Sequence, residues 1–519
     1  MAITTPAWVR DAVFYQVFPD RFAPSERVAK PGRLEDWDAP PTAEGFKGGD
    51  LLGIAERLDY LADLGVTALY LNPIFVSASN HRYHTDDYLA VDPLLGRDEA
   101  LRQLLDACHG RGMRVVLDGV FNHCGRGFWP FHHVAETGAA SPYRDWFYLD
   151  KAVLRGERQL LAYPGEAELR GLVGGPWDEE RHVRSRSQRV LGYRAWWDLP
   201  ALPKLNVGNP PTREYLLGVA EHWLRFGIDG WRLDVPEEIA DVAFWREFRR
   251  RVKTVDPDAY IVAEIWHVAP ERLAGDQFDA TMNYPLAEAI LGFAAGSHLD
   301  RAVVASHHTY AQEVRPLRAT AFARRLEGLL SIHDPAVTAV QLNLLGSHDL
   351  PRFVTMCGGD RASLRLATLI QMTLPGAPCL YYGDEIGLEG GMNPGCRGAF
   401  PWDPSRWDAD LRDFVRGAIA LRHAHPVLRH GAFRAVAAQG MSIAYARSRG
   451  DEWILVAVNA GERPSRLELS VPEAAGRTVE AVSWPGWEAP ARWRPAVVTA
   501  DSITVELAAR DGLVLRATR

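Results

Sequence analysis

Eight short apolar segments recur along the chain, and segments with helical periodicity separate most of them. Helical periodicity is seen, for example, in residues 212–226, 239–252 and 361–373. The apolar segments are residues 12–22, 66–72, 114–123, 229–235, 260–266, 278–283, 340–345 and 379–382. Strands that alternate with helices form parallel sheets, and eight such units close into a barrel. The sequence therefore predicts an α/β fold with an eightfold (β/α)8 TIM barrel, whose active site would lie where the strands end.

Two parts of the chain interrupt this alternation. Residues 124–205 are rich in Trp, Gly, Arg and Pro and are too long for an ordinary loop. We interpret them as a small inserted domain, called domain B, that follows the third barrel strand and covers the barrel mouth. Residues 429–519 show short alternating segments with turn residues, which predict an antiparallel β-sandwich. Residues 1–123 and 206–428 would then form the barrel.

The charge distribution argues against a polyanionic partner. The 519 residues carry a net charge of −8, and both signs are spread along the chain, so we expect no nucleic acid and no membrane partner. Five scattered cysteines without C-x-x-C spacing indicate reduced thiols, not a disulfide frame or a zinc site. The start of the sequence has no secretion leader, and no apolar run is long enough for a bilayer. The sequence therefore predicts a cytoplasmic protein with a small, uncharged partner.

An arginine and an aspartate interrupt the apolar run at residues 227–238. Side chains alternate along a strand, so Arg232 and Asp234 share one face. A buried charge needs a partner, and a structural salt bridge is the ordinary explanation for an isolated R-x-D pair. The other strand ends decide whether that explanation is sufficient.

Acidic residues stand at the ends of four predicted strands, namely Asp118, Asp234, Glu264 and Asp349. Taken singly, Asp118 could cap a turn and Glu264 could form a salt bridge. The neighbouring His123 and His348 could be satisfied core histidines. Carboxylates crowded at one barrel mouth repel one another, however, and proteins tolerate this mainly where shifted pKa values serve catalysis or a metal. We therefore interpret the cluster as functional.

Six motifs occur in a fixed order along the chain. They are GVTALYLNP at 65–73, DGVFNH at 118–123, LPKLN at 202–206, GWRLD at 230–234, AEIW at 263–266 and SHD at 347–349. Together they resemble the signature regions of the α-amylase superfamily of glycoside hydrolases, over essentially the whole chain. The LPKLN, EIWH and GSHD forms are similar to the neopullulanase, cyclomaltodextrinase and maltogenic amylase group. Relatives that resemble oligo-1,6-glucosidases carry an acidic residue in place of Lys204.

The resemblance implies a retaining α-glucan hydrolase that acts on short or cyclic maltooligosaccharides. It would cleave α-1,4 bonds through a covalent glycosyl-enzyme, with α-1,6 bonds left open as a second target. Asp234 would be the nucleophile. Glu264 would be the general acid and then the base that activates water. Asp349 would hold two sugar hydroxyls and help to distort the ring.

The resemblance also implies a set of substrate-binding residues. Tyr83 would stack beneath the reacting sugar ring, and Trp266 beneath the next one. Arg232 would keep Asp234 ionised, with Asp118 as its own counter-charge. The full set is Tyr83, His81, Asp118, His123, Lys204, Arg232, Glu238, Trp266, His348, Asn393 and Arg397. The prediction includes no metal ligand and no required cofactor.

The sequence departs from this group in three places. No β-domain precedes the barrel, so the homodimer that such a domain builds is left open. Asn393 stands where the group has an aspartate near Arg397, and His84 replaces the aspartate after the stacking tyrosine. Pro-Glu replaces Ala-Asn at residues 236–237, on the leaving-group side. These changes should weaken the binding of sugar units beyond the first subsite. We therefore predict a preference for compact, above all cyclic, substrates over starch.

Three questions stay open at this level. Asn122 matches a calcium-ligand position of secreted amylases, and it could equally be a structural hydrogen-bonding residue. A transglucosylase or isomerase acting on maltose, sucrose or trehalose would use the same carboxylates. A non-catalytic, glycan-binding barrel is a third reading, and the intact Asp234, Glu264 and Asp349 count against it.

Overall fold

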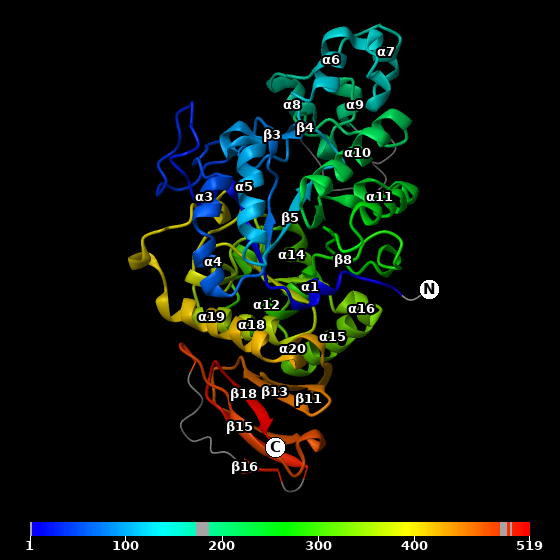
Figure 1. The fold of residues 1–519 in the computed structure, drawn as a ribbon. Helices are drawn as coiled ribbons and strands as arrows, with labels where there is room; N and C mark the ends of the chain where they lie inside the picture. Colours follow the sequence, from blue (N-terminus) through cyan, green and yellow to red (C-terminus); the bar gives the residue numbers. More distant parts are fainter. Residues whose placement is uncertain (1–2, 173–185, 488–495, 499–500, 519) are drawn as a thin grey trace.

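The computed structural model describes residues 3–172, 186–487, 496–498 and 501–518. Eight parallel strands form one sheet in the order β8-β7-β6-β5-β2-β1-β10-β9. A parallel bridge between Met282 and Leu342 joins the two ends of this order, so the sheet closes on itself (Figure 1). The strands are β1 (Phe14–Val17), β2 (Ala68–Leu71), β5 (Arg114–Gly119), β6 (Gly230–Leu233), β7 (Tyr260–Ala263), β8 (Ala280–Thr281), β9 (Leu342–Leu344) and β10 (Ala377–Tyr381). The predicted eightfold barrel is confirmed.

Helices lie between the strands along the chain, as the alternation predicts. The longer ones are α5 (Arg97–His109), α10 (Pro210–Phe226), α11 (Val242–Val255), α12 (Tyr284–Ala294), α15 (Ala319–Ser331), α18 (Arg361–Thr373) and α19 (Ala409–Ala424). Local chemistry sets their ends. The side chain of Asn209 caps α10 by accepting from the Thr212 N–H, and Gly227 ends it with φ 118°. The helix predicted at residues 361–373 has the observed bounds.

Two expectations about local structure are wrong. The strand expected over residues 12–22 ends at Val17, and residues 19–22 form the short helix α2 (Pro19–Phe22). Proline is favoured at the first helical position because the N–H it lacks would be unpaired there. The single helix expected over residues 51–64 is two helices, α3 (Leu51–Glu56) and α4 (Leu58–Leu64), which meet at Arg57.

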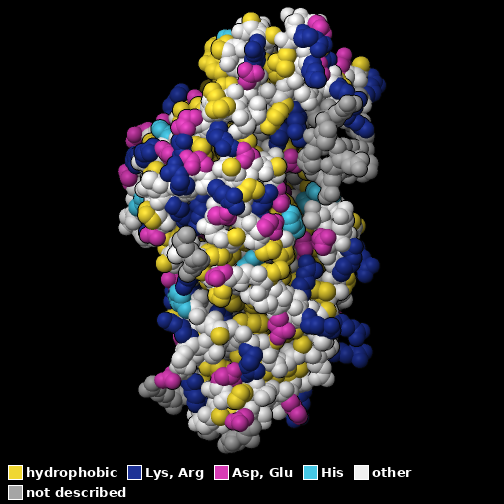
Figure 2. All heavy atoms as spheres, turned by 90° about the vertical axis from the view of Figure 1, so that its right-hand side faces the viewer, with side chains coloured by type: hydrophobic (Ala, Val, Ile, Leu, Met, Phe, Trp, Pro, Cys, Tyr) yellow, Lys and Arg dark blue, Asp and Glu magenta, His cyan; other side chains and the backbone are white. Residues whose placement is uncertain are grey.

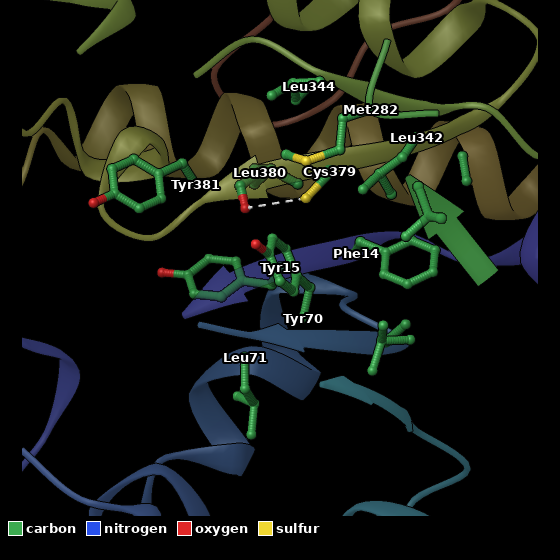
Figure 3. Close-up of a cluster of buried hydrophobic side chains, with 14 of the residues drawn as sticks. Phe14, Tyr15, Tyr70, Leu71, Met282, Leu342, Leu344, Cys379, Leu380 and Tyr381 are labelled. Carbon is green, nitrogen blue, oxygen red and sulfur yellow. Dashed lines mark hydrogen bonds between the residues drawn. The ribbon is translucent and has the colours of Figure 1, made fainter. Parts of the chain in front are cut away.

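The barrel strands are buried on both faces. Every residue of β1, β2, β6 and β7 is buried, because helices cover the outside and side chains fill the inside. Figure 3 shows Tyr15, Tyr70 and Cys379, from three different strands, within one such cluster of buried side chains. This packing fixes the strand ends, and therefore the side chains that follow them, in rigid positions.

The chain leaves the barrel after β5 and returns before α10. Between them lie α6 (Trp129–Thr137), α7 (Lys151–Leu154), α8 (Glu166–Leu172) and α9 (Arg186–Leu191), which form the upper end of the molecule in Figure 1. An antiparallel bridge from His123 to Lys204 ties the two ends of this segment together, and a second bridge from Phe147 to Leu205 ties its interior to its end. Residues 173–185 lie outside the described residues. The exact bounds of domain B and of the other domains stay predictions.

The C-terminal part lies at the opposite end of the molecule (Figure 1). Six strands form an antiparallel sheet in the order β11-β12-β13-β18-β15-β16, and β14 and β17 form a second, two-stranded sheet. Their apolar side chains share a small core of their own, which includes Leu455, Leu467 and Val505. The strands are β11 (Ala432–Gln439), β12 (Ser442–Arg449), β13 (Glu452–Asn459), β14 (Ser465–Ser470), β15 (Thr478–Ala481), β16 (Ala496–Val497), β17 (Ser502–Leu507) and β18 (Asp511–Thr518). The antiparallel β-sandwich is confirmed.

The surface carries charges of both signs. On the face that Figure 2 shows, Lys and Arg side chains are interspersed with Asp and Glu. Within the described residues, no helix is long and apolar enough to cross a membrane.

Candidate active site

Arg232 of β6 lies at the centre of the predicted carboxylate cluster. Its Nη1 donates to Asp118 Oδ1 at 2.7 Å and to Asp234 Oδ1 at 3.2 Å. Its Nη2 lies 3.0 Å from Glu264 Oε1. Asp118 lies within β5, whereas Asp234 and Glu264 directly follow β6 and β7. One fully buried guanidinium therefore gathers carboxylates from three neighbouring strands.

The backbone after Asp234 has an unusual conformation. Val235 has φ 35° and ψ 53°, a left-handed conformation that β-branched residues rarely adopt and that costs about 1–3 kcal/mol. In this conformation the Val235 N–H donates to Glu264 Oε2 at 2.9 Å. This hydrogen bond connects the residue after Asp234 to Glu264 and so fixes the positions of these two catalytic candidates relative to each other.

Apart from Arg232 Nη2, which lies in an ion pair with Glu264, two buried polar atoms at the mouth have no hydrogen-bond partner among the described residues. They are Asp234 Oδ2 and His123 Nε2. An unpaired buried polar atom costs about 1–3 kcal/mol, so such atoms are expected where a ligand supplies the missing partner. A polyhydroxylated ligand would satisfy both.

Burial dominates the pKa values of the acids. Burial, together with the charge of Glu264, raises the pKa of Asp234 well above its usual range despite the opposing effect of Arg232. Burial also raises the pKa of Glu264, which Arg232 opposes and Asp349 reinforces. Two carboxylates this close together repel each other when both are charged, so Asp234 and Glu264 are expected to hold one proton between them. A general acid and a nucleophile that act together require this state.

Asp349, beyond the end of β9, is held by a histidine and an arginine. His348 Nε2 lies 3.1 Å from Asp349 Oδ2, and Arg397 Nη2 donates to Asp349 Oδ1 at 3.1 Å. Gln16 Nε2 lies 3.0 Å from His348 Nδ1. An amide NH2 can only donate, so Nδ1 accepts and the ring proton of His348 belongs on Nε2, whose hydrogen-bond partner is the Tyr83 hydroxyl at 2.7 Å. Burial lowers the pKa of His348 well below its usual range, so the ring is neutral.

Tyr83 joins these two groups of residues. Its hydroxyl lies 2.7 Å from both Asp118 Oδ2 and His348 Nε2, and its ring stacks on His348 with centroids 5.3 Å apart. His81 Nδ1 accepts from the Tyr83 N–H at 3.2 Å. His84 contacts His81 edge-on at 4.9 Å, and burial lowers the pKa of His84 to about 4.

The LPKLN motif contributes a buried ammonium. Lys204 Nζ donates to Asn122 Oδ1 and to the Glu238 carbonyl oxygen, and lies 3.9 Å from Glu238 Oε2. Burial lowers the pKa of Lys204 to about 7. The Lys204 side chain therefore already contacts the Asn122 oxygen that calcium would use. Among the described residues, no group of three or more His, Cys, Asp or Glu side chains could hold a metal ion.

Two predicted substrate-binding residues, Asn393 and Trp266, form no hydrogen bond with the carboxylates within the part of the chain that the structure describes. Asn393 is exposed and Arg397, four residues later, is buried against Asp349 and the His348 carbonyl. Trp266 stacks on Tyr284, with centroids 3.6 Å apart, and on His307 at 4.9 Å. A sugar could use the face of Trp266 only where these rings leave it free, so its stacking role stays a prediction.

Several residues in direct contact with the cluster are absent from the sequence prediction. Tyr70 donates to Asp118 Oδ2 at 2.8 Å, and the Met282 sulfur accepts from Arg232 Nε at 3.3 Å. Gln16 bridges His348 and Asn72, whose side-chain oxygen lies 3.0 Å from it. Gln16 lies within β1 and Asn72 follows β2. A search for polar side chains at the ends of all eight strands could have found both, whereas nothing in the sequence points to Met282.

The arrangement can perform general acid–base and nucleophilic chemistry on a neutral, hydroxyl-rich molecule. Comparison with known proteins agrees with this reading. The family described as "Alpha amylase, catalytic domain" matches residues 16–420. A cyclomaltodextrinase from Geobacillus thermopakistaniensis (strain MAS1) is 42% identical over 476 residues, which cover 91% of this chain and 72% of that protein.

Two solved structures cover nearly the whole chain. Ttha1563 from Thermus thermophilus is 44% identical with a TM-score of 0.87, over 99% of this chain and 100% of that one. The cyclic α-maltosyl-(1→6)-maltose hydrolase from Arthrobacter globiformis, in complex with cyclic α-maltosyl-(1→6)-maltose, is 36% identical with a TM-score of 0.82. It covers 99% of this chain and 100% of that one.

Proposed function

The chain belongs to the α-amylase family of glycoside hydrolases, and from this premise we propose how its site works and what it cleaves. It is a retaining α-glucan hydrolase that cleaves α-1,4 bonds of short or cyclic maltooligosaccharides. One observation carries the proposal: the buried Arg232 guanidinium contacts Asp118, Asp234 and Glu264 at once. This contact lowers the repulsion among the three acids and aims two of them at a common point.

In the first step, an ionised Asp234 oxygen attacks the anomeric carbon while Glu264 gives its proton to the departing glucosidic oxygen. The carbon–oxygen bond to the leaving sugar breaks as the bond to Asp234 forms. Asp234 Oδ2, which has no partner among the described residues, is the oxygen free to attack. Arg232 contacts the other oxygen, Oδ1, and favours its charged form.

In the second step, Glu264 takes a proton from water, and the hydroxide attacks the same carbon. The bond to Asp234 breaks, and both carboxyl groups return to their starting protonation states. Two inversions at one carbon give overall retention. Asp349 would accept hydrogen bonds from two sugar hydroxyls, and Arg397, which donates to Asp349 Oδ1, would fix its position.

Within this class of substrates, we propose that the enzyme prefers a compact or cyclic maltooligosaccharide. Arg397 pairs with Asp349, and Asn393, which is exposed, carries no charge with which to bind a chain farther out. The relatives named above include a cyclomaltodextrinase and a hydrolase of a cyclic α-1,6-linked maltose dimer. Both names favour a cyclic substrate, with α-1,6 bonds as a second target.

Product analysis tests this proposal. The enzyme is incubated separately with β-cyclodextrin, cyclic α-maltosyl-(1→6)-maltose, maltotriose, pullulan and soluble starch, and kcat/KM is compared per bond. NMR of the first products reports the anomer, and retention predicts the α-anomer. A higher kcat/KM for starch, or a first product with β configuration, would contradict the proposal. Asn393→Asp is the matched variant, and it should raise the relative rate on starch.

Two further assignments are parts of the proposal. A cytoplasmic location is supported by the five cysteines, all of which are buried and unpaired. A homodimer remains a prediction, and light scattering of the purified protein at several concentrations would decide it. The substrate itself is a small glycan, as the activities of the relatives indicate.

A further inference from the structure

Met282 lies at the point where the barrel closes. It directly follows β8, and its N–H donates to the carbonyl oxygen of Ala263, the last residue of β7, at 2.9 Å. On its other side it forms a parallel bridge with Leu342 of β9. Met282 and Leu342 belong to the same cluster of buried side chains (Figure 3). The backbone of Met282 is therefore held on both sides, and its side chain starts from a fixed position.

The sulfur of Met282 accepts from two donors. Arg232 Nε donates to it at 3.3 Å, and the Tyr284 hydroxyl donates to it at 4.0 Å. A thioether sulfur carries no proton, so it can only accept. Burial, together with the charges of Glu264 and Asp349, raises the pKa of Tyr284 well above its usual range. The Tyr284 hydroxyl therefore keeps its proton and acts as a donor.

The contact with the sulfur occupies the third nitrogen of the Arg232 guanidinium. Nη1 donates to Asp118 and Asp234, and Nη2 lies 3.0 Å from Glu264 Oε1. Nε donates to the Met282 sulfur. A guanidinium presents its N–H groups in a rigid plane, so an acceptor at Nε also sets the directions of the other two nitrogens.

The chemistry of methionine suits this position. Its sulfur is neutral and polarizable, so it can accept from Arg232 without adding a charge. A carboxylate at position 282 would place a fourth negative charge in the cluster and compete for the charge of Arg232. An aliphatic side chain would leave the buried Nε without its acceptor. The sulfur can therefore orient the guanidinium and leave its charge to the acids.

Tyr284 connects the sulfur to the segment that carries the proposed acid. Its ring stacks on Trp266 with centroids 3.6 Å apart and planes 8° apart. Trp266 follows Glu264 by two residues, and Tyr284 is completely buried. The stack holds the ring of Tyr284 and thereby directs its hydroxyl toward the sulfur. Met282 thus lies between Arg232 and the segment that follows β7.

From these contacts we infer that Met282 is a positioning residue for the hydrolysis: its sulfur, held from the other side by Tyr284, fixes the orientation of the Arg232 guanidinium. This inference rests on the proposed function and adds the group that directs the shared guanidinium. Without the sulfur, Arg232 can turn in its plane, and its contact with the nucleophile Asp234 weakens.

The first test compares Met282→Leu with Met372→Leu. Met372 is the matched control because it is completely buried, lies in α18 and undergoes the same substitution. Met282→Leu should lower kcat on β-cyclodextrin about five- to twentyfold and leave KM within about twofold, because the guanidinium contacts the acids. Met372→Leu should change neither value. Met282→Gln offers an amide oxygen as acceptor, so its kcat should exceed that of Met282→Leu. Circular dichroism and melting temperature check that each variant is folded.

The pH profile distinguishes positioning from a purely structural role. Burial raises the pKa of Asp234 well above its usual range, and Arg232 opposes this rise. The carboxylates that reinforce the rise are Glu264, Asp118 and Asp349. In Met282→Leu the contact with Arg232 weakens, so the pKa of Asp234 should rise further. The acid limb of kcat/KM against pH should therefore move to higher pH, whereas Met372→Leu should leave it in place.

A double variant tests the link through Tyr284. Tyr284→Phe removes the hydroxyl, keeps the ring on Trp266 and should lower kcat about two- to fivefold. If Tyr284 acts through the sulfur, Met282→Leu with Tyr284→Phe should lose no more than Met282→Leu alone. Tyr310→Phe is the control. Tyr310 is a second buried tyrosine whose ring contacts Trp266, at 6.5 Å, and its hydroxyl has no hydrogen-bond partner in the described part of the chain. This variant should leave kcat nearly unchanged.

Two results would overturn the inference while the hydrolase proposal stands. One is a Met282→Leu variant that matches Met372→Leu in kcat and in its pH profile. The other is a double variant in which the two losses multiply, because the two side chains would then act independently. If the parent enzyme cleaves neither β-cyclodextrin nor α-maltosyl fluoride, the proposed function itself is wrong.

Discussion

Buried arginines serve two regions of this molecule in opposite ways. At the barrel mouth, Arg232 contacts the carboxylates of Asp118, Asp234 and Glu264. At the junction between the barrel and the C-terminal sheets, Arg422 of α19 and Arg447 of β12 are equally buried. Their hydrogen bonds go to backbone carbonyl oxygens. All three side chains are about 0% exposed, so burial alone does not distinguish the two regions.

At the junction, the two arginines donate hydrogen bonds to backbone carbonyl groups at the ends of neighbouring segments. Arg447 Nη1 donates to the carbonyl oxygens of Thr373 at 2.6 Å and Leu428 at 2.8 Å, and Nη2 donates to that of Gly431 at 2.7 Å. Arg422 Nη1 donates to the carbonyl oxygens of Met372 and Leu374, each at 3.0 Å. Carbonyl groups that the end of α18 leaves unpaired are satisfied in this way.

The two environments shift the arginine pKa in opposite directions. Burial would lower the pKa of Arg232, but Asp118 and Glu264 raise it well above its usual range. Burial lowers the pKa of Arg422 to about 9 and that of Arg447 to about 10, so both stay charged near neutral pH. The comparison teaches that an arginine among carboxylates tunes reactive groups, whereas an arginine among carbonyl oxygens joins segments of the chain. The following predictions test that distinction.

The largest effect is expected from Asp234→Asn at the mouth. Amide nitrogen or oxygen cannot form the covalent intermediate, so kcat on β-cyclodextrin should fall at least about a thousandfold. The fold should persist, because the amide keeps the shape of the carboxyl group. Steady-state kinetics with circular dichroism checks both points. A variant that keeps a tenth of the parent kcat would refute the assignment of the nucleophile.

Glu264→Gln should lose turnover nearly as far on sugar leaving groups, because the proton donor is gone. Fluoride leaves without a proton, so α-maltosyl fluoride should still give a burst of glycosyl-enzyme. Rapid-quench kinetics with both substrates measures the difference. Equal losses on the two substrates would count against the acid role and in favour of a purely positioning role.

Arg447→Met should show the opposite pattern at the junction. Several buried carbonyl oxygens lose their donor, and we expect the free energy of unfolding to fall by about 2–4 kcal/mol. kcat/KM per folded enzyme should stay within about twofold of the parent. Arg449→Met, an exposed position on the same strand, is the control and should have little effect on either quantity. Denaturant unfolding with parallel activity assays tests this, and a large loss of kcat would break the proposed separation of the two regions.

The smallest effect concerns pH and stability. The raised pKa of Asp234 means that the native state holds its proton more tightly than the unfolded chain does. The parent therefore loses stability as pH rises from about 3.8, the unfolded value, through the folded pKa. Asp234→Asn lacks this loss, so its melting temperature relative to the parent should rise over that window and then level off. Arg447→Met should show no such trend, because the groups that bind it do not titrate. A melting-temperature difference that is constant from pH 4 to pH 8 would show that Asp234 is not strained by burial.

The order of strands and helices could be predicted from the sequence because periodicity is a local property. Seven of the eight barrel strands lie within the predicted segments, whereas β10 begins two residues before its segment, and the helix over residues 361–373 has its predicted bounds. Local patterns do not fix where an element ends when the ends depend on neighbouring segments. The strand expected to reach Phe22 therefore ends at Val17, and the helix expected over residues 51–64 is divided at Arg57.

The site followed from the sequence only in part. Asp118, Asp234, Glu264 and Asp349 could be identified because carboxylates at the ends of parallel strands must meet at one end of a barrel. The approach of the Met282 sulfur to Arg232 Nε, 50 residues away in the chain, could not be identified in this way. Likewise, the pairing of Arg397 with Asp349, 48 residues away in the chain, depends on distances in space.

The sequence by itself determined the barrel, the reaction class and the four acids. The spacing of hydrophobic residues and the polar residues that follow each strand can both be read from consecutive positions. Only the tertiary structure decided how those acids share one guanidinium, which oxygen of Asp234 is left free, and that His123 stacks on Trp196 of the inserted segment. These features depend on the closure of the barrel and on the return of the inserted segment over its mouth. Closure brings side chains within about 3 Å of one another regardless of their separation in the chain, and no local pattern encodes such distances.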